Sequence, residues 1–235
     1  MAILTVYPDP NPETTSVDGQ AQRSLVDENL ATIRAGAGTS AEDTFTSVVT
    51  VEFRCSATTN QFDTISRGFY LFDTSSLGSG VTISSAILSL MGLSGKFNNI
   101  SGGTPEYDIG ASSPASNTAI VASDYSTVSY TNFSTGISFT NFASESYNDF
   151  TLNASGISNI SLAGISKFSG LSGWDINNNF DGTWSSGVVM QINNYMADNA
   201  GTTKDPKLVI TYSPTGMIQK PKPLRPRIFG PGLAR

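Results

Sequence analysis

The side chains of this protein that could act as catalytic acids, bases or metal ligands are mainly carboxylates. The chain has no histidine and a single cysteine, which excludes Ser-His-Asp and Cys-His nucleophiles and histidine-ligated zinc. Two carboxyl groups about 5–10 Å apart could hydrolyse a glycosidic bond. Sequence spacing pairs none of the candidates, which are Asp73, Asp108, Asp149, Asp175 and Asp181. Surface solvation explains these acids more simply, so we expect no catalytic residue, and a glycan hydrolase is only a distant alternative.

The segment from Trp174 to Gly182 places oxygen donors at alternate positions. The hard ligands that calcium prefers are supplied there by Asp175, Asn177, Asn179 and Asp181. An EF-hand loop needs glycine at its sixth position, where Phe180 stands, and a glutamate at its twelfth, which is missing. We therefore interpret the segment as an asparagine-rich turn between strands, with calcium as the alternative. No other cofactor is expected.

Two tryptophans, Trp174 and Trp184, flank this turn. An exposed indole can stack on a sugar ring, which makes the pair a candidate glycan-binding platform. Tryptophan is more often part of the core, because its ring buries a large apolar surface. We therefore expect both side chains to pack inward, and glycan contact is the alternative.

The elements that must position these groups are predicted to be strands. Residues 65–72 alternate between two faces, and from Phe69 onward both faces are apolar, so this part of the strand is expected to be buried on both sides. In residues 82–93, Ala86, Leu88 and Leu90 line one face opposite a serine-rich one. Further strands are expected near residues 2–7, 30–35, 47–57, 62–73, 105–111, 147–152, 164–169, 185–195 and 206–213. One short helix is expected after Asn153, ending at Gly164.

The pattern F-D-T-S-S-L at residues 72–77, followed by I-S-S-A-I-L-S-L and the closing D-P-K-L-V-I-T-Y at residues 205–212, resembles the DNRLRE family of β-sandwich domains. The resemblance covers most of residues 1–213. It implies an all-β, two-sheet antiparallel sandwich of jelly-roll type. It also implies a secreted bacterial protein, a surface protein, or a structural or adhesin module of a tailed bacteriophage. Family members share no catalytic signature, so the resemblance implies no reaction.

Composition agrees with one β domain, residues 1–213, followed by a tail, residues 214–235. Hydrophobic residues make up 38% of the chain and charged residues 14%, which suits a sizeable core joined by many polar turns. The single cysteine, Cys55, excludes an internal disulfide and is expected to be a buried, inert thiol, with pairing between chains as the alternative. Residues 112–146, rich in serine, threonine and asparagine, are expected to be an excursion at the rim of the sandwich, where binding would reside.

The tail differs from the body in charge. It holds five of the 13 basic residues and no acid, leaving eight basic residues against 19 acidic ones in residues 1–213. An acidic body is expected to repel nucleic acid and anionic membrane. Five prolines favour an extended tail, whose partner-binding residues would be Arg225, Arg227, Ile228, Phe229 and Leu233. We expect it to dock on a neighbouring subunit or another protein, the alternative being a disordered appendage.

The first functional hypothesis is a non-enzymatic structural protein of a phage virion: a capsid decoration, head fibre or tail-associated sandwich. It would be attached through its tail and would belong to a homo-oligomer or a large assembly, with a host glycan as a possible contact. The start M-A-I-L-T-V lacks the basic and apolar segments of a secretory signal, and no apolar run is long enough to span a membrane. The missing signal favours a virion component over the alternative, a carbohydrate-binding adhesin module at a bacterial surface.

Overall fold

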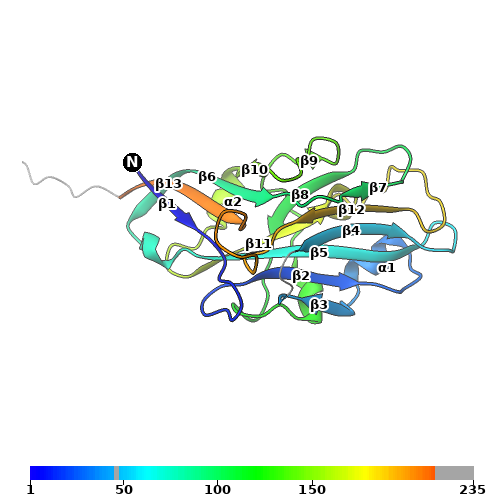
Figure 1. Cartoon of the computed structure of the whole chain (residues 1–235), viewed down its shortest axis with the longest axis horizontal. Helices are drawn as coiled ribbons and strands as arrows, with labels where there is room; N and C mark the ends of the chain where they lie inside the picture. The colour runs from blue at the N-terminus through cyan, green and yellow to red at the C-terminus, as the bar shows by residue number, and fades with distance from the viewer. Residues whose placement is uncertain (45–47, 215–235) are drawn as a thin grey trace, which may run out of the picture.

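The computed structural model describes residues 1–44 and 48–214, and it confirms an antiparallel two-sheet sandwich (Figure 1). The small sheet has the order β1-β13-β6-β10. The large sheet has the order β7-β12-β4-β5-β11-β8-β9, and β2 joins it between β5 and β3. The strands are β1 (Ala2–Val6), β2 (Asp18–Arg23), β3 (Ser40–Glu42), β4 (Val49–Cys55), β5 (Phe62–Asp73), β6 (Val81–Met91), β7 (Phe97–Asn98), β8 (Glu106–Ala111), β9 (Ile137–Ser138), β10 (Tyr147–Thr151), β11 (Ile165–Ser172), β12 (Val189–Asn194) and β13 (Lys207–Pro214).

Short helices connect the strands. They are α1 (Leu30–Ala35), η1 (Ser75–Leu77), η2 (Ala122–Thr127), α2 (Ala154–Ser158) and α3 (Gly173–Ile176). The prediction of a strand at residues 30–35 was wrong: the Asn29 side chain accepts a hydrogen bond from the Thr32 amide and caps a helix that buries Ile33. The predicted helix after Asn153 is confirmed with that residue as its cap. It ends at Ser158, however, because Asn159 already closes it, well before Gly164.

The long strand β5 organises the large sheet. Ser66 is paired with both Glu52 of β4 and Gln22 of β2, so those two strands lie on opposite edges of β5. Gly68 is likewise paired with both β2 and β11. Along one edge of β5, β4 is paired with residues 62–66 and β11 with residues 68–73, while β2 occupies the other edge. The strands beyond β4 and those beyond β11 therefore form two separate branches of the large sheet.

Aromatic side chains fill the interior. Tyr107 of β8 lies 5.7 Å, between ring centroids, from Phe150 of β10, and this contact joins the two sheets. A second cluster on the large sheet brings Phe53, Phe62, Trp174 and Phe180 together, with ring centroids 5.0–5.5 Å apart. Burial of these rings supplies much of the hydrophobic stabilisation, since each removes a large apolar area from water.

The last strand of the body extends to Pro214, the first residue of the predicted tail. Pro214 is still part of β13, where it is paired with Val81 of β6. β13 lies between β1 and β6, and Figure 1 shows its end at the same end of the molecule as the amino terminus. The body therefore ends at one extremity of its long axis.

Candidate functional site

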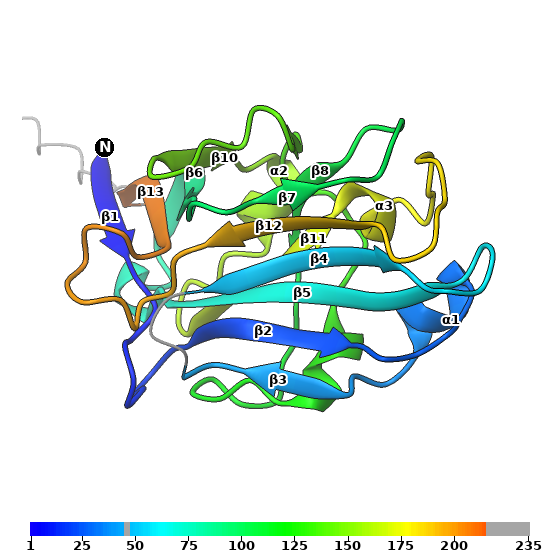
Figure 2. The ribbon, with the colours of Figure 1, turned by 45° about the vertical axis from the view of Figure 1, so that its right-hand side comes forward.

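One face of the large sheet is polar across four strands. The register sets Gln22 of β2 beside Ser66 of β5, Ser66 beside Glu52 of β4, and Glu52 beside Gln191 of β12. Residues that are paired in this way project from the same face. The opposite face of β4 is apolar and buried, which gives this strand its strictly alternating burial. Figure 2 shows β12, β4, β5 and β2 side by side, with α1 and α3 behind them. We call this polar surface the amide face.

A hollow of about 540 Å³ lies on the amide face. Its polar lining consists of Gln20, Gln22, Ser40, Glu42, Thr50, Gln191 and Asn193, and Ala41 and Val48 add small apolar surfaces. This volume lies in the range of small-molecule binding sites.

Hydrogen bonds between these side chains hold them in place. The Thr50 hydroxyl donates to Asn193 Oδ1 at 3.0 Å, and the Gln191 amide donates to the same oxygen at 3.2 Å. Gln20 reaches across Gly68 of β5 and accepts from the Thr50 backbone amide. The Gln22 amide donates to the Ser40 hydroxyl at 3.0 Å. The lining is therefore ordered before any ligand arrives.

A second hollow, of about 440 Å³, adjoins the first and shares Gln22 with it. It contains an ion pair in which Arg54 Nε donates to Glu52 Oε1 at 2.8 Å. Leu25 lies at its edge, 91% exposed, with a φ of 57°. Left-handed backbone is unfavourable for a branched side chain such as leucine. The Leu25 amide is held there by a hydrogen bond to Asp63 Oδ1 of 3.1 Å.

Sequence reasoning missed the amide face, although its signal is present. Residues 18–23, D-G-Q-A-Q-R, were not predicted to be a strand because Ala21 is their only apolar residue. The alternation Q-x-Q in β2, T-x-E-x-R in β4 and Q-x-N in β12 is the pattern of outward-facing polar positions. Reading the three together would have indicated a shared polar surface.

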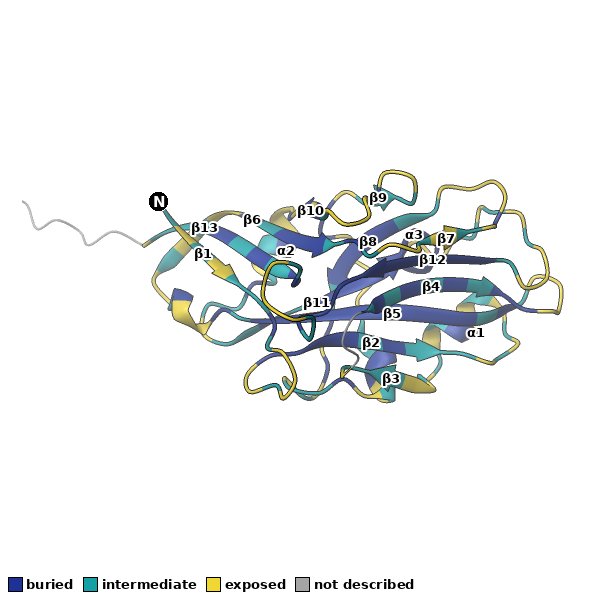
Figure 3. Ribbon diagram, in the orientation of Figure 1, coloured by how far each residue is buried: buried dark blue, intermediate teal, exposed yellow. Residues whose placement is uncertain are grey.

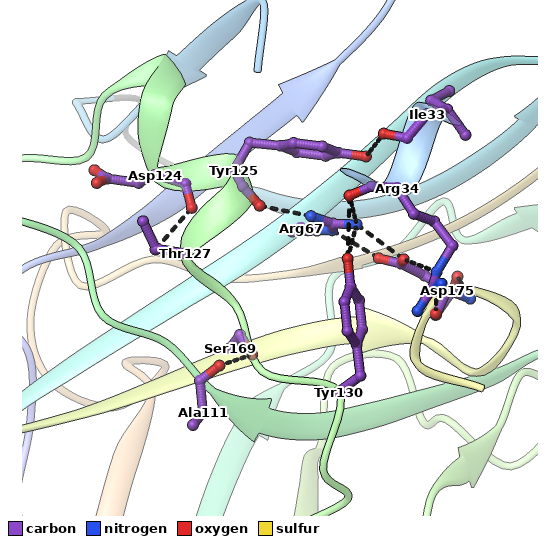
Figure 4. Close-up of polar contacts among 11 residues, drawn as sticks. Ile33, Arg34, Arg67, Ala111, Asp124, Tyr125, Thr127, Tyr130, Ser169 and Asp175 are labelled. Atoms are coloured by element: carbon purple, nitrogen blue, oxygen red, sulfur yellow. Dashed lines mark hydrogen bonds and ion pairs between the residues drawn. The ribbon is translucent and has the colours of Figure 1, made fainter. Parts of the chain in front are cut away.

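The opposite side of the large sheet holds a buried charge network (Figure 4). Arg67 and Asp175 are both fully buried and paired at 2.7 Å. Arg34 of α1 pairs with Asp175 at 3.1 Å, and the Arg67 guanidinium lies 3.8 Å from the centroid of the Tyr125 ring. These contacts tie α1, η2 and α3 to β5. The network is internal, so its chemistry serves the fold.

This network overturns the calcium interpretation at Asp175, because both of its carboxylate oxygens are engaged by arginine. Asp181 is turned toward Trp174, whose Nε1 donates to it at 2.6 Å, and toward Thr104. Asn177 and Asn179 line a small pocket of about 60 Å³ with Asp181. Across residues 1–44 and 48–214, no group of three or more acidic, histidine or cysteine side chains is arranged to hold a metal.

The two tryptophans differ in burial. Trp174 is 2% exposed and lies inside the aromatic cluster with Phe53 and Phe180. Trp184 is half-buried against the core, and its Nε1 donates to the Gln61 carbonyl at 2.9 Å. The interpretation as core residues is therefore correct for Trp174, and a glycan platform built on it is wrong.

Among the other carboxylates, the structure brings Asp108 close to Glu106. A carboxylate oxygen of Asp108 lies 2.6 Å, and one of Glu106 lies 2.8 Å, from the position that a Cβ atom on Gly136 would occupy. Burial and then the Glu106 charge raise the pKa of Asp108 to about 7. Asp108 is 2% exposed, and its Oδ2 atom has no hydrogen-bond partner among the described residues. A substrate cannot reach this group. Asp73 and Asp149 lie apart from this pair, on β5 and β10.

Residues 112–146 contain η2 and β9. They do more than line a rim, because Tyr125 of η2 is fully buried and its hydroxyl donates to the Ile33 carbonyl at 2.8 Å. Cys55 is buried, as expected. The predicted partner-binding residues of the tail, Arg225, Arg227, Ile228, Phe229 and Leu233, lie outside the described residues.

The chain matches no protein-family model, and no curated protein is similar enough to count as a relative. The resemblance to DNRLRE domains therefore stays a prediction. Within the part of the chain that the structure describes, no helix combines the length and hydropathy needed to cross a membrane.

Proposed function

We propose that this protein is a non-enzymatic structural component of a tailed-phage virion, attached through residues 215–235 and displaying its sandwich outward. The observation that carries the proposal is the separation of two surfaces. β13, which leads into the tail, ends at one extremity of the body, beside β1. The amide face lies elsewhere, on the large sheet, and is free to meet another molecule while the tail is engaged.

The character of the body supports a role in binding. Its buried arginine, Arg67, is paired internally with Asp175, and acidic residues outnumber basic ones in residues 1–213. Its core is a continuous apolar cluster that includes residues of both sheets, such as Phe69 and Leu208. A sandwich held together in this way needs neither a disulfide nor a metal, which suits a protein that folds in a reducing cytoplasm before assembly.

The test is the location of the protein in purified phage particles whose genome encodes it. Immunogold labelling with antibodies against the body should mark the particle surface, and mass spectrometry should detect the chain after density-gradient purification. A chain ending at Pro214 should fold with an unchanged melting temperature and should remain in the supernatant. Retention of this shortened chain on particles would refute attachment through the tail.

The second candidate function is a carbohydrate-binding or adhesin module of a bacterial surface protein, and the amide face favours it as a binding surface. Fractionation separates the two candidates. Labelling of the cell envelope, with none on particles, would support the adhesin and exclude the virion component.

A further inference from the structure

We propose that the amide face binds a neutral, linear oligosaccharide along the two hollows that meet at Gln22. The inference rests on the proposed function, because it gives the outward-facing body a ligand class and a site. The groups assigned to hydrogen bonding are Gln20, Gln22, Ser40, Thr50, Gln191 and Asn193. None of these residues was a candidate in the sequence.

The charge of the groove selects a neutral ligand. Among the described residues that line the first hollow there is no lysine or arginine, and Glu42 is the only acidic side chain. In the second hollow, Arg54 is engaged by Glu52, and Asp63 adds a further negative charge. Phosphates, sulfates and acidic sugars would therefore meet repulsion with no free cation to offset it. Nucleic acid is excluded from this surface for the same reason.

The chemistry of the groove matches hydroxyl groups. Each carboxamide offers acceptors and donors side by side, and each sugar hydroxyl both donates and accepts. Gln20 Nε2, Gln22 Oε1 and Gln191 Oε1 make no hydrogen bond within the described chain, while the other end of each amide is held by a neighbour. Anchored amides with one free end lose little side-chain entropy on binding.

A buried hydroxyl without a partner lies in the same cross-strand row as two of the lining residues. Ser66 stands between Gln22 and Glu52 in the cross-strand row, and it is 1% exposed. Its Oγ has no hydrogen-bond partner among residues 1–44 and 48–214. A buried polar atom without a partner is costly. A ligand that draws the Gln22 amide inward, or that brings a water with it, would remove this cost.

The groove also has an apolar edge. Leu25 is 91% exposed and is held at a φ of 57° by its hydrogen bond to Asp63. Strained backbone of this kind persists where the surrounding structure fixes it, and it concentrates at ligand sites. The exposed isobutyl group at the end of a polar groove offers a surface for the apolar face of a sugar ring.

The experiment is a titration of the full chain with maltohexaose, cellohexaose and chitohexaose as neutral probes and hexagalacturonate as the acidic one. Binding is measured by isothermal titration calorimetry and by amide chemical shifts in NMR spectra. At least one neutral hexasaccharide should bind and shift the amides of β2, β4 and β12. Gln22→Ala and Gln191→Ala should each weaken binding about tenfold, which corresponds to one lost hydrogen bond. Asn141→Ala is the matched control, because Asn141 is an exposed amide away from the groove.

Each other outcome overturns the inference: no binding of any neutral probe, preference for hexagalacturonate, or affinity that Gln22→Ala and Gln191→Ala leave unchanged. The unchanged melting temperature of each variant must accompany the titration, so that lost affinity is not lost folding. The titration does not involve the particle. A chain that binds glycan but is missing from virions refutes the proposed function alone, and a virion protein that binds no neutral glycan refutes this inference alone.

Discussion

Arg67 donates to both carboxylate oxygens of Asp175, at 2.7 Å through Nε and 2.9 Å through Nη2, and neither side chain is exposed to solvent. The geometry is the bidentate arrangement in which arginine recognises carboxylates most strongly. Arg67 also donates to the Tyr125 carbonyl and to the Tyr130 hydroxyl. Because Arg67 Nη2 also donates to the Arg34 carbonyl at 3.1 Å, the connecting segments that contain α1, η2 and α3 are all fixed to one guanidinium in the middle of β5.

Replacing Arg67 should be severely destabilising. Arg67→Met leaves the Asp175 charge buried with only the partly exposed Arg34 as partner, so the free energy of unfolding should fall by about 3–5 kcal/mol. Urea denaturation measures this. Lys204→Met is the control: the Lys204 and Glu145 side chains are 38% and 47% exposed, and loss of this pair should lower the free energy of unfolding only slightly. Similar losses in the two variants would contradict the structural role of the network.

The stability of the protein should fall as the pH rises from about 4 to 7. Burial, followed by the Glu106 charge, raises the pKa of Asp108 to about 7, whereas an unfolded aspartate titrates near its ordinary value of 3.8. The folded state therefore holds a proton that the unfolded state releases in this range, and this contribution to stability is lost as the pH passes through the folded pKa. Asp18 and Asp205 are shifted in the same direction, mainly by burial.

The variant Asp108→Asn isolates the contribution of this carboxyl group. It removes the titrating group at nearly constant shape, so its melting temperature should exceed that of the wild type at pH 8 and approach it at pH 4. Differential scanning calorimetry across this range gives both curves. Parallel curves would show that Asp108 does not titrate between these limits.

The thiol of Cys55 should be inert in the folded protein. It is 1% exposed, and burial raises its pKa to about 11, so thiolate is scarce at pH 8. Ellman's reagent should react with it only after the protein is unfolded in concentrated guanidinium chloride. Rapid labelling under native conditions, or a reducible dimer on gels, would contradict burial and favour pairing between chains.

Trp174→Ala should act on folding and not specifically on ligand binding. The ring lies in the aromatic cluster with Phe53 and Phe180, and its removal should cost about 3–5 kcal/mol. Val121→Ala, at a residue 49% exposed, should cost less than about 0.5 kcal/mol. A stable Trp174→Ala protein that selectively loses sugar binding would contradict this prediction and would show that the indole contacts the sugar.

The sequence predicted strands well where burial imposes a clear period. β5 begins and ends where alternation over residues 62–73 places it, and β4, β6 and β13 follow the same rule. β2 was missed because it contributes one small side chain, Ala21, to the core. Its pairing with β5 and β3 comes from tertiary context, which local propensity does not record.

The sequence carries the polar alternation of β2, β4 and β12 but not the pairing of these strands, so the polar positions could be recognised while the site that they form together could not. Gln22, Thr50 and Gln191 meet only through the pairing of β2, β4 and β12 with their neighbours. The calcium and sugar-platform interpretations were drawn from one contiguous segment, residues 174–184. In this segment Asp175 belongs to the buried charge network and Trp174 to the aromatic cluster, and residue types alone do not reveal either role.

The first and last strands of the body, β1 and β13, are neighbours in the small sheet, with Ala2 beside Tyr212. Figure 3 shows the exposed positions of β1 at this outer edge. During synthesis, the small sheet cannot form completely until β13 has been made, because β13 lies between β1 and β6. Closure of the small sheet is therefore a late event in folding, and chains interrupted shortly before β13 would leave the β13-facing edges of β1 and β6 unpaired and prone to aggregate.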